Sequence, residues 1–181
     1  MRVVAGRFGG RRLVAPPGET TRPTSDRVRE ALFSMLGPLD DARVLDLFAG
    51  TGALAIEALS RGAAHAVLVE PDRAALHAIR ANLAALGLGE GEARVVAAPA
   101  RTALRDASAR ADTYDLVFVD PPYRSAPGLG RELSEGLGAL LAPSARVVCE
   151  SNRRHPLELD LILERERRYG ATLIRIHTNG P

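Results

Sequence analysis

The apolar residues of this chain gather in short runs, and each run is followed by a segment of helical periodicity. Runs of a length typical of buried strands occur at 44–47, 66–69, 94–97, 114–119 and 145–149. Apolar residues at helical spacing fill the intervals at 53–60, 73–86, 100–108 and 129–141. Because strands that alternate with helices form doubly wound folds, we expect an α/β protein with a mostly parallel sheet.

Both ends of the chain depart from this alternation. Residues 157–168 and 171–177 alternate between apolar and polar positions around Tyr169-Gly170, which predicts an antiparallel hairpin that closes the sheet. Residues 1–15 predict a second hairpin, and the glycines of Phe8-Gly9-Gly10 allow the positive φ angles of its turn.

A loop rich in Pro and Gly follows the first hairpin. A helix is expected next, because Val28, Leu32 and Met35 lie on one face at helical spacing, and Gly37-Pro38 would end it. We therefore expect two parts, an N-terminal extension of hairpin, loop and helix at 1–37 and a main domain at 38–181.

Charge is distributed unevenly along the chain. The net charge is only +2, and all 24 basic residues are Arg. Residues 1–24 alone carry a net charge of +4, and a basic arm on a nearly neutral body is typical of proteins with a polyanionic partner. The alternative is an edge hairpin whose Arg side chains are merely solvated. The first interpretation assigns RNA contacts to Arg7, Arg11, Arg12, Arg22, Arg27 and Arg29.

Composition argues against several other classes of protein. The single Cys149 excludes a disulfide framework, and the His residues lack the spacing of metal ligands, so we expect no metal. No apolar run approaches the roughly 20 residues of a membrane span, and the N-terminus lacks the apolar region of a signal peptide. We therefore expect a cytoplasmic monomer with no membrane partner.

A glycine turn between two acids forms the first candidate site. Gly50-Thr51-Gly52 follows a predicted strand and precedes a helix, while Asp46 and Glu70 end two successive strands. The turn fits a dinucleotide fingerprint, but a nicotinamide dinucleotide offers no cationic amine for Asp46. S-adenosylmethionine fits better, because its amino group suits Asp46 and its ribose suits Glu70. The structural alternative is that Asp46 caps the turn and Glu70 is a solvated acid.

The stretch Asp120-Pro121-Pro122-Tyr123 forms the second candidate site, directly after the strand at 114–119. Two consecutive prolines stiffen the backbone at the edge where open α/β sheets place their ligands. The Asp120 carboxylate and the Pro121 carbonyl could accept the two N–H bonds of a planar amine, and Tyr123 offers a stacking face for a base. The structural alternative is a turn with Tyr123 at its rim.

These motifs carry a family resemblance. The segment 45–52, then Glu70, then Asp120-Pro121-Pro122-Tyr123 resembles the motif order of class I amino-methyltransferases. The more specific stretch 22–33, together with the opening residues 3–13, closely resembles the RsmD family of bacterial 16S ribosomal RNA guanine-N2 methyltransferases. The resemblance spans nearly the whole chain.

The resemblance implies a Rossmann-like fold with a mostly parallel seven-stranded sheet and an antiparallel C-terminal hairpin. It implies methyl transfer from S-adenosylmethionine to N2 of one guanine of 16S ribosomal RNA, in the assembled or partly assembled small subunit, and an extension that faces the RNA. Catalysis is assigned to Asp120, Pro121, Pro122 and Tyr123. Cofactor binding is assigned to Thr24, Asp46, Phe48, Ala49, Gly50, Thr51, Gly52, Glu70, Pro71, Ala100 and Asp120.

Other functions stay open at this point. DNA adenine-N6 and protein glutamine-N5 methyltransferases share the proline motif, but a separate recognition domain has little room in 181 residues. The glutamine enzymes usually carry Asn in place of Asp120. A non-catalytic RNA-binding assembly factor on the same fold is the alternative of another class, and the intact Asp46, Glu70 and Asp120 argue against it.

Overall fold

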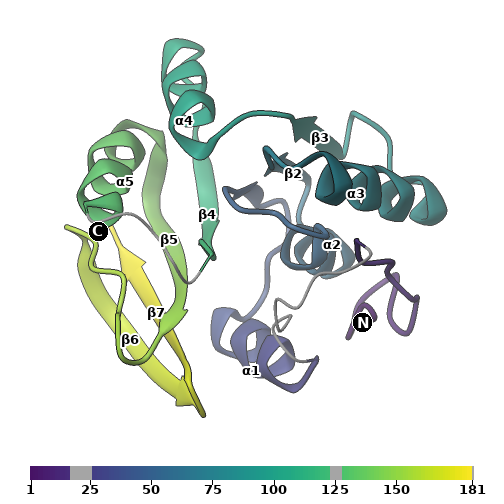
Figure 1. The fold of residues 1–181 in the computed structure, drawn as a ribbon, viewed down its shortest axis with the longest axis horizontal. Coiled ribbons are helices and arrows are strands. Elements are labelled where there is room, and N and C mark those ends of the chain that lie inside the picture. The colour runs from purple at the N-terminus through teal and green to yellow at the C-terminus, as the bar shows by residue number, and fades with distance from the viewer. Residues whose placement is uncertain (17–25, 123–127, 181) are drawn as a thin grey trace.

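The structure is a computed structural model that describes residues 1–16, 26–122 and 128–180. Its centre is a seven-stranded sheet in the order β3-β2-β1-β4-β5-β7-β6 (Figure 1). The strands are β1 (Arg43–Asp46), β2 (His65–Val69), β3 (Ala93–Val96), β4 (Tyr114–Val119), β5 (Leu141–Asn152), β6 (Ile162–Tyr169) and β7 (Thr172–Thr178). The helices are α1 (Asp26–Leu36), α2 (Ala53–Ser60), α3 (Arg73–Leu86), α4 (Ala100–Ala109) and α5 (Leu129–Leu137).

The strand pairing confirms the predicted mixed sheet. The first five strands pair in parallel, and β7 pairs in antiparallel register with both β5 and β6. The chain moves outward from β1 to β3 and then returns to the other side of β1 at β4. Doubly wound folds bind their ligands at such a reversal, so the topology makes the carboxyl ends of β1 and β4 the expected place for a site.

Two apolar cores cover the two faces of the sheet. Alternate residues of each strand point to opposite faces, so Val44 and Phe118 join the core beneath α1 and α2, while Leu45 and Val117 join the core beneath α4 and α5. Figure 1 shows the two helical layers on either side of the strands. None of the helices in the described ranges is long and apolar enough to cross a membrane.

The boundary between α5 and β5 differs from the sequence prediction. The helix ends at Leu137 rather than at residue 141, a 3-10 turn spans Gly138–Leu140, and β5 begins at Leu141. Gly136 and Gly138 weaken the last turn, because glycine loses the most backbone freedom in a helix. β5 also runs past Cys149, since β7 pairs with it as far as Asn152.

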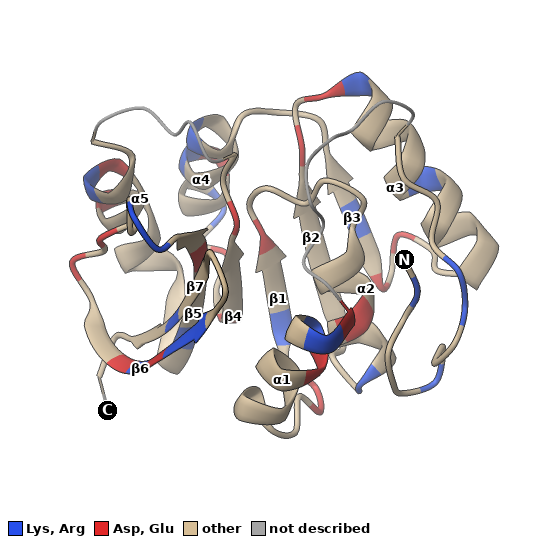
Figure 2. Cartoon of the chain, turned by 60° about the horizontal axis from the view of Figure 1, so that its bottom comes forward, with Lys and Arg blue, Asp and Glu red and all other residues tan. Residues whose placement is uncertain are grey.

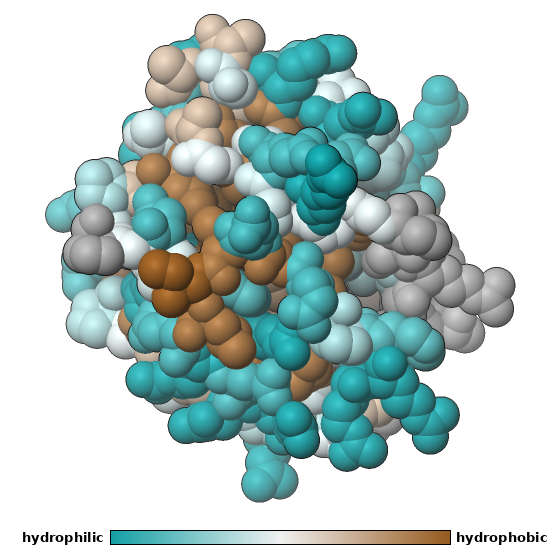
Figure 3. Space-filling view, turned by 90° about the vertical axis from the view of Figure 1, so that its left-hand side faces the viewer, coloured by the Kyte–Doolittle hydropathy of each residue, from teal (hydrophilic) through white to brown (hydrophobic). Residues whose placement is uncertain are grey.

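The C-terminal hairpin is present, but its first strand starts later than predicted. β6 begins at Ile162 rather than at residue 157, while Leu157 and Leu159 are buried against α5 in a connecting segment. The alternation of residues 157–161 therefore reflects burial of a loop against a helix and not strand pairing. Figure 3 faces this side of the molecule and shows apolar residues at its surface. Ile162 and Leu163 at the start of β6 are exposed.

The N-terminal segment is a paired turn, shorter than the predicted two-stranded hairpin. A single bridge joins Arg2 to Arg12, and the Val3 N–H donates to the Arg11 carbonyl at 2.9 Å. Val3 and Leu13 are buried in the same core as α1 and α2. This arm, which we define as residues 1–16, therefore shares a core with the sheet, and the domain boundary at residue 37 stays a prediction.

Candidate active site

Acidic side chains meet at the carboxyl edge of the parallel strands. Asp46 ends β1, Glu70 follows β2 and Asp120 follows β4. The register of β4 and β5 brings Glu150 beside Asp120. Figure 2 shows acidic positions at this edge, at the ends of β1 and β4 and near the end of β5. The sequence prediction that Asp46, Glu70 and Asp120 share one edge agrees with this register.

Asp46 is a buried acid that lacks a firm partner. Its side chain is 1% exposed, and neither carboxylate oxygen forms a hydrogen bond of ordinary geometry with the described residues. Loss of hydration raises the pKa of Asp46 to about 7; the backbone N–H groups of Ala55 and Phe48 lower it, and the charge of Glu70 raises it. A buried carboxylate in this state favours a cationic partner, because pairing would offset the loss of hydration.

The glycine turn packs tightly between β1 and α2. The Ala49 N–H donates to the Val69 carbonyl at 3.0 Å, and the Gly52 N–H donates to the Ala49 carbonyl at 2.6 Å. Gly52 has φ +78°, and a Cβ atom there would lie 2.9 Å from Leu68 Cδ2. Glycine suits this positive φ, and its missing side chain lets the turn pack closely against Leu68 in the core.

Glu70 holds the glycine turn in place. Its Oε2 accepts a hydrogen bond from the Gly50 N–H at 2.9 Å, and its Oε1 accepts one from the Asp72 N–H at 2.9 Å. Each carboxylate oxygen retains a further acceptor site. Glu70 therefore has a structural role that the sequence did not predict, and its predicted contact with ribose hydroxyls stays a prediction that this geometry permits.

Asp120 lies next to two other carboxylates. Burial raises the pKa of Asp120 well above its usual value, and the negative charges of Glu150 and Asp46 raise it further. Sequence reasoning missed Glu150, which is 6% exposed. The available signal was the acid that directly follows the buried run ending at Cys149, the same pattern that identified Asp46.

The described residues among the rest of the proline motif and the cofactor assignment differ in burial. Pro121 is buried and Pro122 is exposed, while Tyr123 and Thr24 lie outside the described residues. Ala100 is 9% exposed at the start of α4, and Phe48 is half-buried against the core beneath α4 and α5. In the described ranges, no group of His, Cys, Asp or Glu side chains is arranged to hold a metal ion.

Four of the Arg residues predicted to contact RNA lie at the surface. Arg12 and Arg27 are exposed, and Arg11 donates to the Ala85 carbonyl at 2.9 Å. Arg7 forms an ion pair with Glu92 at 2.5 Å. Arg22 lies outside the described residues. Figure 2 shows basic positions along the arm, so this surface is available to a polyanion.

Arg29 corrects the sequence prediction. Its side chain is 1% exposed, and its guanidinium donates to the Arg2 carbonyl and, at 2.7 Å, to Asp26 Oδ1. Burial lowers the pKa of Arg29, and the charges of Asp26 and Glu57 act in the opposite direction. Arg29 therefore fixes the arm to α1 and is not available to RNA.

Two buried polar side chains also hold the arm, and no sequence pattern indicated either of them. Glu57 on α2 is 0% exposed and accepts hydrogen bonds from the N–H groups of Val4 at 2.6 Å and Ala5 at 3.0 Å. Asn82 on α3 accepts from the Val14 N–H at 2.8 Å. It also donates to the carbonyls of Val14 at 3.0 Å and Thr51 at 2.9 Å. Asn82 therefore connects the arm directly to the glycine turn.

Comparisons with known proteins cover nearly the whole chain. The model of a family described as Conserved hypothetical protein 95 matches residues 1–178. "Ribosomal RNA small subunit methyltransferase D" of Escherichia coli (strain K12) is 47% identical over 125 residues, which are 68% of this chain and 61% of that protein. The Haemophilus influenzae protein of the same name is 31% identical over 188 residues, covering 99% of this chain and 94% of that protein.

Solved structures agree with the fold. A hypothetical protein of Thermus thermophilus superimposes with a TM-score of 0.84 and 34% identity, covering 98% of both chains. An RNA methyltransferase from Salinibacter ruber in complex with S-adenosyl-L-homocysteine has a TM-score of 0.65 at 20% identity, covering 87% of this chain and 94% of that one, a likeness of fold alone. The match of the family model and the identity to the methyltransferase D proteins place this chain in the Conserved hypothetical protein 95 family, the RsmD family.

Proposed function

We propose that the protein transfers a methyl group from S-adenosylmethionine to the exocyclic N2 of a guanine in 16S ribosomal RNA of the small subunit. One observation carries this proposal: Asp46 and Asp120 lie close together at the carboxyl edge of the sheet. Asp46 is a buried acid without a hydrogen bond of ordinary geometry, and Asp120 is the acid of the proline motif. The first acid suits a cationic donor, and the second suits an amine acceptor. The names of the related proteins support RNA of the small subunit as the substrate.

The donor side of the site fits S-adenosylmethionine. Asp46 would pair with its amino group, the backbone of Gly50-Thr51-Gly52 would approach its methionine part, and Glu70 would accept its ribose hydroxyls. Residues Phe48, Ala49, Pro71 and Ala100 would surround the rest. When bound, the donor supplies an electrophilic methyl group on a sulfonium.

The acceptor side must orient a weak nucleophile. The lone pair of an exocyclic amine is delocalised into the ring, so the amine needs hydrogen-bond acceptors that fix its direction. The Asp120 carboxylate and the Pro121 carbonyl would accept its two N–H bonds. A raised pKa makes Asp120 a better proton acceptor than an ordinary carboxylate once the amine becomes cationic.

The test is Asp120→Asn, which keeps the size of the side chain and removes its charge. We expect methyl transfer to small subunits that lack the modification to fall by at least about a hundredfold, while binding of S-adenosylmethionine persists. Asp106→Asn on the exposed surface of α4 is the matched control. Mass spectrometry of ribosomal RNA from cells without the protein identifies the position, because one methylated guanine should be missing. Transfer to DNA or to a protein glutamine instead would overturn the assignment.

A further inference from the structure

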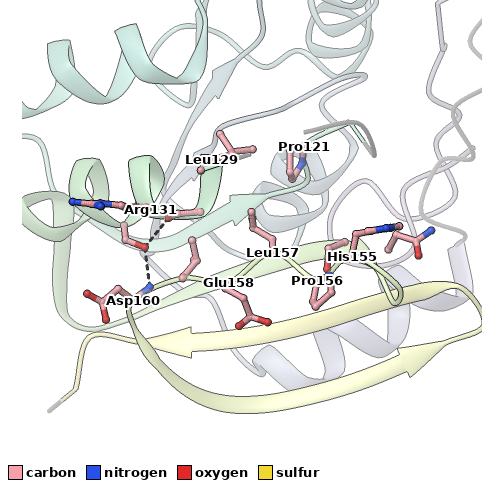
Figure 4. Close-up of a pocket in the computed structure, with 14 residues that line it drawn as sticks. Pro121, Leu129, Arg131, His155, Pro156, Leu157, Glu158 and Asp160 are labelled. Atoms are coloured by element: carbon pink, nitrogen blue, oxygen red, sulfur yellow. Dashed lines mark hydrogen bonds between the residues drawn. The ribbon is translucent and has the colours of Figure 1, made fainter. Parts of the chain in front are cut away.

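A cavity of about 630 Å³ lies between α5 and the segment that connects β5 to β6 (Figure 4). Its lining includes Pro121 of the proline motif, the first turn of α5, the end of β5 and residues 155–160. The volume falls within the range of sites for small ligands. None of the roles assigned above uses this cavity, apart from the shared wall at Pro121.

The cavity lies on the face of the sheet opposite the acids. Val148 belongs to the core beneath α1 and α2, whereas Cys149 belongs to the core beneath α5. Because side chains alternate along a strand, Glu150 lies on the same face of the sheet as Val148, and Ser151 lies on the same face as Cys149. The acids therefore face the donor side, and Ser151 faces the cavity across the same strand end.

The walls of the cavity are firmly built. A Cβ atom at Gly130 would lie 2.0 Å from the Glu158 carbonyl oxygen, so α5 and the connecting segment approach as closely as glycine allows. Ser134 Oγ donates to the Gly130 carbonyl at 2.8 Å and accepts from the Asp160 N–H at 2.8 Å (Figure 4). Leu157 is 9% exposed and contributes an apolar floor. These contacts fix the wall between α5 and the connecting segment.

One polar group in the lining lacks a partner. Ser151 is 9% exposed, and its hydroxyl forms no hydrogen bond within the described part of the chain. A hydroxyl that faces a cavity can bond to a ligand without giving up a partner in the protein. Ser151 therefore suits a ligand with polar groups as well as an apolar face.

The rim beside Ser151 is basic. Arg153, Arg154 and His155 are consecutive exposed residues in the tight turn that follows Asn152, and His155 belongs to the lining of the cavity. The turn is held because the Arg154 N–H donates to Asn152 Oδ1 at 2.8 Å and the Arg153 N–H donates to the Ala171 carbonyl at 2.8 Å. Of the two acids in the lining, Glu158 is paired with Arg175 at 2.7 Å, and Asp160 lies at the opposite end of the cavity from His155 (Figure 4). The rim therefore favours a phosphate.

We propose that the cavity binds the nucleotide adjoining the methylated guanine in the RNA chain. The proposal rests on the proposed function. The base would lie on the apolar floor and bond to Ser151, and its phosphate would meet the basic rim. Pro121 would separate this base from the guanine held at Asp120, so one rigid residue would set the spacing of two successive nucleotides.

The test compares inhibition of methyl transfer by guanosine 5′-monophosphate and by dinucleotides that carry guanosine at either end. In the wild type, one dinucleotide series should bind about tenfold more tightly than the mononucleotide. Ser151→Leu, which fills the cavity, should remove that advantage and raise the KM for small subunits, with kcat and the Kd for S-adenosylmethionine unchanged. Thr172→Leu, on β7 and outside the cavity lining, is the matched control.

The outcomes separate the two proposals. Failure of the wild type to methylate small subunits would overturn the proposed function itself. An active wild type that binds no dinucleotide better than the mononucleotide, or a Ser151→Leu variant that keeps the advantage, overturns the nucleotide site alone. If Ser151→Leu does not fold, His155→Ala at the exposed rim decides the question, because loss of the same advantage supports the site and its retention contradicts it.

Discussion

At the scale of single residues, Asp46 shows how the site is prepared for a charged ligand. A buried carboxylate with a pKa of about 7 in place of 3.8 retains its proton in the folded protein at pH values where the unfolded chain has released it. The contribution of Asp46 to the free energy of unfolding therefore falls as pH rises from about 4 to about 7. Above about pH 7 the acid is ionised in both states, and this loss of stability stays constant. A cationic amine would reverse this penalty by pairing with the ionised acid.

Asp46→Asn tests this account. At pH 8 and without S-adenosylmethionine, we expect the variant to be more stable than the wild type by on the order of 2–4 kcal/mol, and the difference should shrink towards pH 5. Urea unfolding at the two pH values measures it. S-adenosylmethionine should raise the melting temperature of the wild type and leave that of the variant unchanged. A variant that is less stable than the wild type at pH 8 would contradict the burial argument.

The sequence identified residues whose role follows from their position in a motif. Asp46 and Asp120 were predictable because each directly follows a buried strand, and parallel strands end at a common edge. Arg29 was assigned wrongly, because the charge count of a segment does not tell which side chain turns inward. Asn82 and Glu57 gave no signal, because their partners lie far away in the sequence.

At the scale of elements, the arm and the glycine turn share a support. Asn82 on α3 is 2% exposed and forms hydrogen bonds with Val14 in the arm and with Thr51 in the turn. Loosening of either Val14 or Thr51 leaves a buried polar group of Asn82 without a hydrogen bond. Occupancy of the donor site and order in the arm should therefore depend on each other.

Asn82→Leu tests the shared support. It leaves the polar groups of Val14 and the Thr51 carbonyl unsatisfied, so we expect a loss of stability of about 1–3 kcal/mol and weaker binding of S-adenosylmethionine. Amide exchange should quicken in both residues 1–16 and the glycine turn. Arg7→Ala is the control, since it removes only the exposed ion pair to Glu92 and the contact with the Phe8 ring, and it should quicken exchange in the arm alone. Unchanged affinity for S-adenosylmethionine in Asn82→Leu would contradict the proposed coupling between the arm and the glycine turn.

Element boundaries were predictable where local signals were strong. The range predicted for α3 was correct, since Asp72 caps it by accepting from Ala74 and Ala75, and Gly87 ends it with φ +70°. The start of β6 was not predictable. Residues 157–161 alternate like a strand, but they pack against α5, and periodicity cannot distinguish burial against a helix from pairing in a sheet.

At the scale of the whole molecule, the fold could be predicted because its topology follows from the alternation of elements. Strand, helix and strand in succession allow few arrangements, and the hairpin at the C-terminus completes the sheet. The alternation could not show the cavity beside α5. That cavity depends on the close approach of Gly130 to Glu158, which is a tertiary contact.

The distribution of charge over the whole molecule gives the last prediction. If the arm meets the proposed RNA substrate through phosphates, each contacting Arg releases a condensed counterion, and the affinity falls more steeply with salt. Arg12→Ala and Arg27→Ala remove exposed cations that lie on the arm and on α1. Each should weaken binding to small subunits and reduce the slope of log affinity against log salt by about 1.

The control for this measurement is Arg105→Ala, because Arg105 is equally cationic but lies exposed on α4, away from the arm. Its salt slope should equal that of the wild type. Arg29→Ala is not a suitable probe, since the side chain is buried and its loss would disturb the contact between the arm and α1. Equal slopes for Arg12→Ala, Arg27→Ala and the wild type would show that the cations of the arm are only solvated, and the RNA would then have to approach over another surface, such as the basic rim at Arg153 and Arg154.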